Sequence, residues 1–138
     1  MTAYPFGGGI QIREYTGKQL WQALEHGLAG KKRDRAASFA GCRFALCGRR
    51  QPLRGQAAGS VYIRDKEGRE SPLEPQARYA VVLGEYLVRG GDGFQMLKAG
   101  KLRATCSQKE QEVVEDYIRR HSPLPPPEAG RVCLEQKR

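Results

Sequence analysis

The residues best suited to ligand chemistry form one glycine-rich run, Gly90-Gly91-Asp92-Gly93-Phe94, directly after an apolar stretch. Glycine adopts backbone conformations that other residues avoid, and it lets a ligand approach the main chain closely. An aromatic ring held beside such a turn can stack on a flat base, which is worth ~1–3 kcal/mol in nucleic-acid complexes. The run is therefore a candidate binding turn with Phe94 as its stacking ring. The alternative is a tight structural turn with Phe94 packed in the core.

Residues that could hydrolyse a phosphoester are missing from the sequence. A two-metal site needs Asp, His and Asn ligands that hold the ions ~3.5–4 Å apart. The chain has two histidines, four aspartates and no asparagine, and no Asp-x-His pair occurs. No serine lies in a Gly-x-Ser-x-Gly elbow. We therefore expect no catalytic residue, no metal ligand and no cofactor in this chain alone.

The charge of the chain favours anionic partners, because 24 Lys and Arg residues face 15 Asp and Glu residues, a net charge of +9. Apart from the cluster at 31–35, the basic residues are scattered among Gly, Pro and Glu, so a nucleic-acid-binding stripe is the lesser alternative. No apolar run approaches the ~20 residues of a membrane span. Four cysteines allow two disulfides in three pairings, and their spacing does not fit a zinc site. They are Cys42, Cys47, Cys106 and Cys133.

The elements around the candidate turn follow from periodicity and capping. Strands are predicted at 10–13, 42–46, 61–64, 79–88 and 131–134, with a hairpin turn at 66–69. Two helices are each predicted to open with a capping box, Thr16 with Gln19 and Ser107 with Glu110. The nearly continuous apolar strand 79–88 is expected at the centre of a sheet, covered on both faces. Asp92 is expected to bond back to its own turn or to cap a short helical stretch at 95–98.

Helices and strands that interleave without a regular βαβ rhythm predict an α/β (α+β) fold, a mixed-sheet sandwich. A chain of 138 residues fits one domain, so we expect a single domain over 1–138 with a Pro-rich segment and tail at 123–138.

Four segments, in order, resemble the C-terminal domain of the 5′-nucleotidase family. Residues 79–94 resemble its strand that ends in Gly-Gly-Asp-Gly-Phe/Tyr, and Pro5-Phe6-Gly7-Gly8 with the helix over 16–26 is similar to its Pro-Phe-Gly turn and following helix. Residues 40–44 are similar to its Ser-Gly-Leu-Arg-Phe strand, and residues 114–132 resemble its last helix and Gly-Arg-Ile/Val ending. The resemblance covers nearly the whole chain and is greatest to the ecto-5′-nucleotidase type. It implies that domain's fold, truncated at its N-terminus.

The same resemblance implies nucleoside or nucleotide recognition, of AMP or adenosine for example. In such enzymes the base lies between two aromatic rings, one of which matches Phe94. The second ring falls on Ala36 without a gap, and Phe39 serves only with a shift of three residues. An Asp that contacts the ribose has no counterpart, because Ala99 and Gly100 occupy its neighbourhood. The binding site is therefore expected to be incomplete and its affinity weak.

The resemblance also implies partners and a compartment. A separate metallophosphoesterase domain with two divalent metals would carry out hydrolysis, so this chain is expected to be inactive alone. Its expected partners are such a domain or a second copy of the chain, and the family suggests an extracellular, cell-surface or periplasmic location. The alternatives are a degenerate, non-enzymatic interaction module and a basic nucleic-acid-binding domain.

Overall fold

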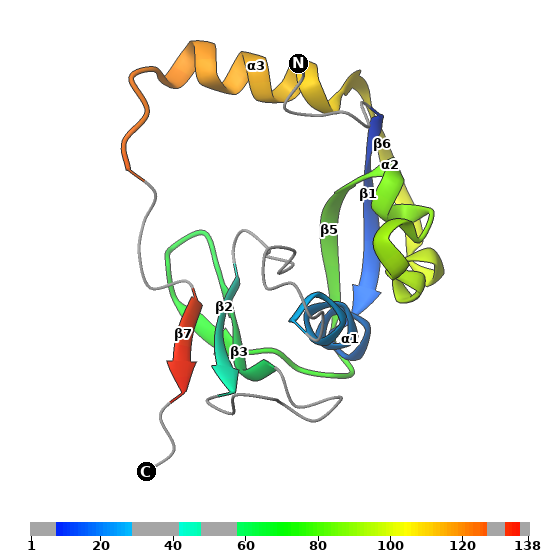
Figure 1. Cartoon of the computed structure of the whole chain (residues 1–138), viewed down its shortest axis with the longest axis vertical. Coiled ribbons are helices and arrows are strands. Elements are labelled where there is room, and N and C mark those ends of the chain that lie inside the picture. The colour runs from blue at the N-terminus through cyan, green and yellow to red at the C-terminus, as the bar shows by residue number, and fades with distance from the viewer. Residues whose placement is uncertain (1–7, 29–41, 48–57, 127–131, 136–138) are drawn as a thin grey trace. The chain divides into compact units, whose positions relative to one another are not determined.

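The computed structural model describes residues 8–28, 42–47, 58–126 and 132–135, and it contains two compact units with one sheet each (Figure 1). The first unit comprises Met1–Tyr15 and Arg78–Pro127, and the second comprises Thr16–Ala77 and Glu128–Arg138. The expectation of one domain over 1–138 with a tail from 123 stays a prediction. In the part of the chain described, no helix has the length and apolar character needed to cross a membrane.

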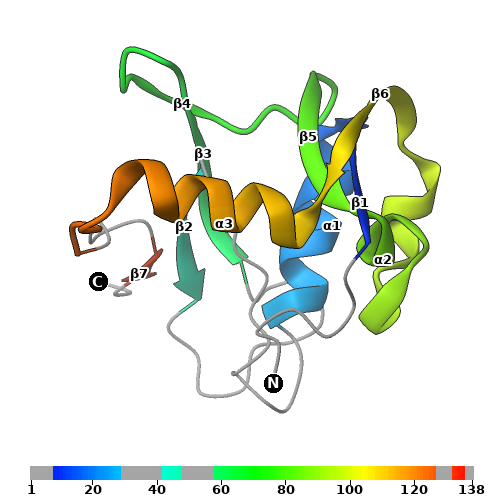
Figure 2. The ribbon, with the colours of Figure 1, turned by 90° about the horizontal axis from the view of Figure 1, so that it is seen from above.

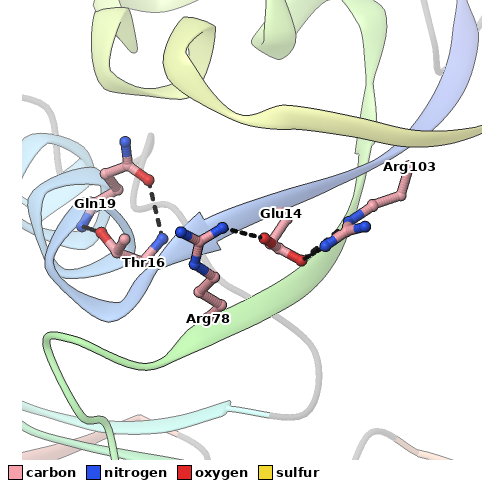
Figure 3. Close-up of polar contacts among 5 residues, drawn as sticks. All are labelled: Glu14, Thr16, Gln19, Arg78 and Arg103. Atoms are coloured by element: carbon pink, nitrogen blue, oxygen red, sulfur yellow. Dashed lines mark hydrogen bonds and ion pairs between the residues drawn. The ribbon is translucent and has the colours of Figure 1, made fainter.

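The second unit begins with helix α1 (Gly17–Leu28), which opens with the predicted capping box. The N–H of Thr16 donates to Gln19 Oε1 at 2.9 Å, and the N–H of Gln19 donates to Thr16 Oγ1 at 3.3 Å (Figure 3). These reciprocal bonds satisfy two backbone donors that a helix start leaves unpaired. The helix contacts strand β3 (Ala58–Arg64). Among the residues of this unit whose burial is described, Leu20, Ala23, Leu24, Val61 and Leu73 are buried and apolar.

Four strands form the sheet of the second unit, in the order β4-β3-β2-β7. Their bounds are Cys42–Cys47 for β2, Glu70–Pro72 for β4 and Val132–Glu135 for β7. Strand β3 pairs antiparallel with both β2 and β4, whereas β7 pairs parallel with β2 at the edge. The predicted mixed sheet, its hairpin and its final edge strand are therefore confirmed.

The β3–β4 hairpin turn is closed by Asp65. Its Oδ1 accepts from the backbone N–H groups of Glu67 at 3.0 Å and Arg69 at 2.8 Å, and these hydrogen bonds, that of Arg69 first, lower the pKa of the carboxyl. Gly68 supplies the left-handed conformation that the turn needs, with φ +82.

Three strands form the sheet of the first unit, in the order β5-β1-β6, with β1 at Gly9–Thr16, β5 at Arg78–Gly84 and β6 at Lys101–Lys109. Strand β6 was not predicted. Its sequence, KLRATCSQK, has little β-branched or aromatic content, and every one of its residues is exposed. It is a strand because it pairs antiparallel with β1, opposite Ile12 at Ala104. A pairing between distant segments leaves no periodicity to find in the strand itself.

The predicted central strand at 79–88 is wrong in its length and in its place. The strand β5 ends at Gly84 and the chain turns into a short helix, α2 (Glu85–Val88), with Glu85 in its first turn. Strand β5 also lies at the edge of its sheet, and exposure alternates along it, with Leu83 buried and Val82 65% exposed. The apolar side chains of the strand therefore bury only one face of the sheet, and the last four residues of the run, 85–88, are helical.

The last helix, α3 (Glu110–His121), starts three residues later than predicted from Ser107. Residue 107 still belongs to β6, which leads into α3 without a loop (Figure 2). The N–H of Lys109 donates to Glu112 Oε2 at 2.9 Å, so the capping carboxylate is Glu112 rather than Glu110. Arg119, Arg120 and His121 occupy the last turn, and the helix ends before Pro123, both as predicted.

Glu14 ties the three strands of the first unit together. Its carboxylate lies between Arg78 of β5, at 3.0 Å, and Arg103 of β6 (Figure 3). The hydrogen bonds from Arg103 and then Arg78 hold the pKa of Glu14 below the ordinary value of 4.5. A carboxylate on the middle strand thus links both edges through ionic hydrogen bonds.

Replacing Glu14 with Gln should lower the free energy of unfolding near neutral pH and flatten its dependence on acid. Because the pKa of Glu14 is lowered on folding, its contribution is complete above about pH 4.5 and is lost as the pH falls through the folded-state pKa. Urea midpoints measured from about pH 7 to about pH 3 should therefore converge for wild type and variant at the acid end. Glu67→Gln, at an exposed turn position, is the control. Equal midpoints for Glu14→Gln and wild type near neutral pH would contradict the assigned role.

Candidate functional site

The candidate turn follows α2 and consists of two short 3₁₀ turns, η2 (Gly91–Gly93) and η3 (Gln95–Ala99). The N–H of Gly90 donates to the carbonyl of Leu87 at 3.0 Å, and the N–H of Phe94 donates to the carbonyl of Gly91 at 3.2 Å. The helical stretch predicted at 95–98 is therefore present. The N-cap position of η3 is Phe94, whose side chain makes no capping bond, and the bond expected from Asp92 to its own turn or to this stretch stays a prediction.

The backbone of this turn explains two of its three glycines. Gly90 and Gly93 have φ +85 and +82, the left-handed region in which a Cβ atom is strained. Asp92 also has a positive φ of 52, and Asp is among the few other residues that tolerate this region. Three of four consecutive residues thus hold conformations that most side chains would oppose.

Tyr86 explains the third glycine and is the residue of this site that sequence reasoning missed. A Cβ atom on Gly91 would lie 2.6 Å from both the ring and the backbone carbonyl of Tyr86, so only glycine fits. The hydroxyl of Tyr86 donates to Asp92 Oδ1 at 3.0 Å, which fixes the carboxylate at the tip of the turn. Tyr86 is 37% exposed. The sequence predicted a strand through residue 88, and in a strand this contact would not form. The contact between Tyr86 and Gly91 exists because the helix α2 turns the chain.

Phe94 is buried, with 8% of its surface exposed, and Leu97, three residues later, is 1% exposed. In this chain by itself the ring contributes to the core of the first unit. Its role as a stacking ring for a base stays a prediction, as do the roles of Gly90, Gly91, Asp92 and Gly93 in binding.

Strand β1 holds the segment that follows the turn. Tyr15, 1% exposed, donates its hydroxyl proton to the carbonyl of Leu97 at 2.7 Å, and burial raises the pKa of this phenol. Arg13 Nη1 donates to the carbonyl of Gly100 at 2.7 Å, while its Nε donates to Gln11 Oε1. Two side chains of β1 thus fix the backbone of Leu97 and Gly100, which follow Phe94 in the chain.

Two other positions considered for the site lie in a part of the chain that the structure does not describe. Phe39, the candidate for the second ring, and Ala36 lie outside the described residues. Ala99 ends η3, and Gly100 lies against the ring of Tyr15, so no carboxylate stands where a ribose contact was sought. Over residues 8–28, 42–47, 58–126 and 132–135, no group of His, Cys, Asp or Glu is arranged to hold a metal ion. Cys106 is a free, exposed thiol.

Comparison of the sequence with protein families gives a match over residues 1–99 to the family described as "5′-nucleotidase, C-terminal domain". The chain is 30% identical over 131 residues to a 5′-nucleotidase of Rattus norvegicus, which covers 93% of this chain and 23% of that protein. It is also 30% identical over 135 residues to a snake venom 5′-nucleotidase of Gloydius brevicauda, with 94% and 23% covered. The chain thus spans about a quarter of the length of these relatives.

Among solved structures, the chain is similar to a 5′-nucleotidase precursor from Thermus thermophilus. The TM-score is 0.80 at 25% sequence identity, over 97% of this chain and 26% of that one. The described helices and sheets therefore have the fold found in part of a larger protein, and the predicted fold class is confirmed.

The close approach at Gly91 predicts an unequal cost of two glycine substitutions. Gly68→Ala places a Cβ at φ +82 in open space, so it should cost only the backbone strain of about 1–2 kcal/mol. Gly91→Ala should cost roughly 2–3 kcal/mol, because the Tyr86 carbonyl is backbone and cannot move aside cheaply. Chemical denaturation of both variants measures the difference. A Gly91→Ala protein as stable as wild type would show that Tyr86 does not pack on the turn.

Proposed function

Because the chain belongs to the family of 5′-nucleotidase C-terminal domains, we propose that it recognises a nucleoside or nucleotide through the Gly90–Phe94 turn. The observation that carries the proposal is the construction of the turn. Its left-handed glycines, the Tyr86–Asp92 bond and the bonds from β1 hold five residues rigidly while leaving backbone free of side chains. A rigid turn loses little conformational freedom when a ligand binds, and the absence of Cβ atoms permits close approach.

The aromatic ring beside these glycines gives the turn its selectivity for flat bases. Phe94 is 8% exposed, so a base would reach only a small part of the ring rather than a wholly open face. The hydroxyls of a ribose would find the Asp92 carboxylate, which is exposed at the tip of the turn. The free energy of partial stacking on Phe94 and of one hydrogen bond to Asp92 is little larger than the entropic cost of immobilising the ligand. We expect adenosine or AMP to bind with a Kd on the order of millimolar.

Hydrolysis would be carried out by a separate metallophosphoesterase domain that binds two divalent metals. That domain is the proposed partner of this chain. The described residues offer no metal-holding group, and the family match itself is to a C-terminal domain. A compartment outside the cytoplasm is proposed on the same basis, since one relative is a venom protein and one structural neighbour is described as a precursor.

Titration of adenosine and AMP, followed by NMR, tests the recognition proposal. Saturable shifts of the Gly90–Phe94 amides are expected. Phe94→Leu keeps an apolar side chain in the core but removes the aromatic ring, so it should fold and lose at least about fivefold in affinity, the low end of a stacking contribution. Phe94→Ala, which also leaves a cavity, should lose affinity and stability together.

Two results would contradict this proposal. Unchanged affinity in a folded Phe94→Leu protein would assign the ring to packing alone. No shift up to about 10 mM ligand, far above the expected Kd, would favour the non-enzymatic interaction module. Binding that weakens steeply with salt would instead indicate a nucleic-acid surface, because base stacking depends little on counterions.

Phosphate release from AMP tests the division of labour. With Mg²⁺, Mn²⁺ or Zn²⁺ added, the chain alone should release no phosphate above the rate in buffer, because a two-metal mechanism needs converging ligands. Release that saturates with AMP, persists through repurification and disappears with a chelator would show that the chain holds its own metal site.

A further inference from the structure

A proline-rich segment follows helix α3 and is exposed at each of its described residues (Figure 1). Residues 122–126 read Ser-Pro-Leu-Pro-Pro and belong to no helix or strand. Leu124, in the middle of the segment, is 49% exposed. Pro123 alone is enough to end the helix. The prolines at 125 and 126 are not needed for that purpose, and nucleoside recognition by the glycine turn does not use them.

The prolines bias this segment towards one backbone conformation. Proline fixes its own φ at about −65° and restricts the residue before it to extended conformations. The run from Pro123 to Pro126 therefore favours the polyproline II helix, which has roughly three residues per turn. In that helix Pro123 and Pro126 lie on one edge, Pro125 on a second and Leu124 on the third. A ligand with a preset conformation loses little conformational entropy when it binds.

The last turn of α3 holds the start of the segment in place. The ring of His121 stacks on the ring of Tyr117, with their centroids 4.2 Å apart, and its Nδ1 lies 2.9 Å from the Tyr117 carbonyl oxygen. The hydroxyl of Ser122 donates to the carbonyl of Ile118. Two carbonyls that a helix end leaves unpaired thus have side-chain partners. These contacts fix the direction in which the chain leaves the helix.

Basic residues immediately precede the prolines. Arg119 and Arg120 lie in the last turn of α3, and each side chain is 76% exposed. Asp116 lies 3.7 Å from the first and 4.0 Å from the second, and ion pairs this exposed contribute little. An acidic pocket beside a proline-binding groove would complement this charge.

We propose that residues 119–126 are a docking segment for a domain of the SH3 type, which binds polyproline II ligands in an aromatic-lined groove. The three prolines occupy the groove, Leu124 points away from it, and the two arginines face an acidic pocket at its end. The contact area is small, so we expect a Kd on the order of 10–100 µM. The proposal concerns this segment alone and does not depend on nucleoside binding.

Titration of the full chain into isotope-labelled SH3 domains, chosen for acidic residues beside the groove, tests the proposal by NMR. Saturable shifts of the groove residues are expected. The control probe is the same domain with the tryptophan of its groove replaced by alanine, which should not bind. Equal binding by that probe, or no saturable shift with any domain at about 500 µM chain, would overturn the proposal. The prolines would then act only as a stiff spacer.

Two variants test the polyproline geometry. Pro126→Ala should weaken binding at least about fivefold, because it frees the backbone and removes one contact with the groove. Leu124→Ala is the matched control and should change the Kd by less than about twofold, since this residue lies on the edge that points away. Both positions lie outside α3, so helical circular dichroism should stay the same. Wild-type affinity in Pro126→Ala, or equal weakening by the two variants, would contradict the docking geometry.

A second pair of variants tests the acidic pocket. Arg120→Gln should weaken binding about threefold at low salt and less at about 0.5 M salt, because salt screens exposed charges. Arg89→Gln is the matched control, since the side chain of Arg89 is 80% exposed and also pairs with a carboxylate four residues away, Glu85 at 3.8 Å. It should leave the affinity unchanged. Equal weakening by both variants would show that net charge alone attracts the domain and would overturn the assigned pocket contact.

Discussion

The buried hydrogen bond from Tyr15 to the carbonyl of Leu97 is the interaction on which the first unit depends. Tyr15 is 1% exposed, and without its partner the hydroxyl would be left unsatisfied in the core, at a cost of about 1–3 kcal/mol. It joins residues 82 positions apart. Because side chains alternate along a strand, Arg13 lies on the same face of β1 and holds Gly100, while Glu14 lies on the other face and holds β5 and β6. One strand therefore fixes both the sheet and the segment after the glycine turn.

The turn contains one strained residue, Asp92, and is kept in place by its surroundings. Gly90 and Gly93 hold positive φ angles that glycine adopts readily, and Gly91 lies too close to Tyr86 to carry a side chain. A non-glycine residue such as Asp92, with φ 52, keeps a left-handed conformation where neighbouring contacts over-determine it, and such residues concentrate at ligand sites. Here the bond from Tyr86 holds the near side and the bonds from β1 hold the far side. The strain is thus compatible with a preformed binding turn.

Features that depend on residues close together in the sequence could be predicted, whereas features that depend on contacts between distant segments could not. The capping box of Thr16 and Gln19 is local, and it forms as predicted. The glycine run was found because its composition is unusual over five residues. Strand β6 could not be found, since it depends on pairing with β1, far earlier in the chain. Tyr86 was missed for a related reason, because an apolar run does not show where a strand ends and a helix begins.

Strand β6 and helix α3, which follow one another in the first unit, use their charges in different ways. Within the described residues β6 lies at the edge of its sheet, and its charged residues, Lys101, Arg103 and Lys109, are all basic. A second β6 strand would meet like charges, which discourages pairing between sheet edges. Helix α3 instead carries acidic residues in its first turn and basic residues in its last turn, which complement the two ends of its dipole. The charges of β6 therefore act against pairing with another strand, whereas those of α3 stabilise the helix to which they belong.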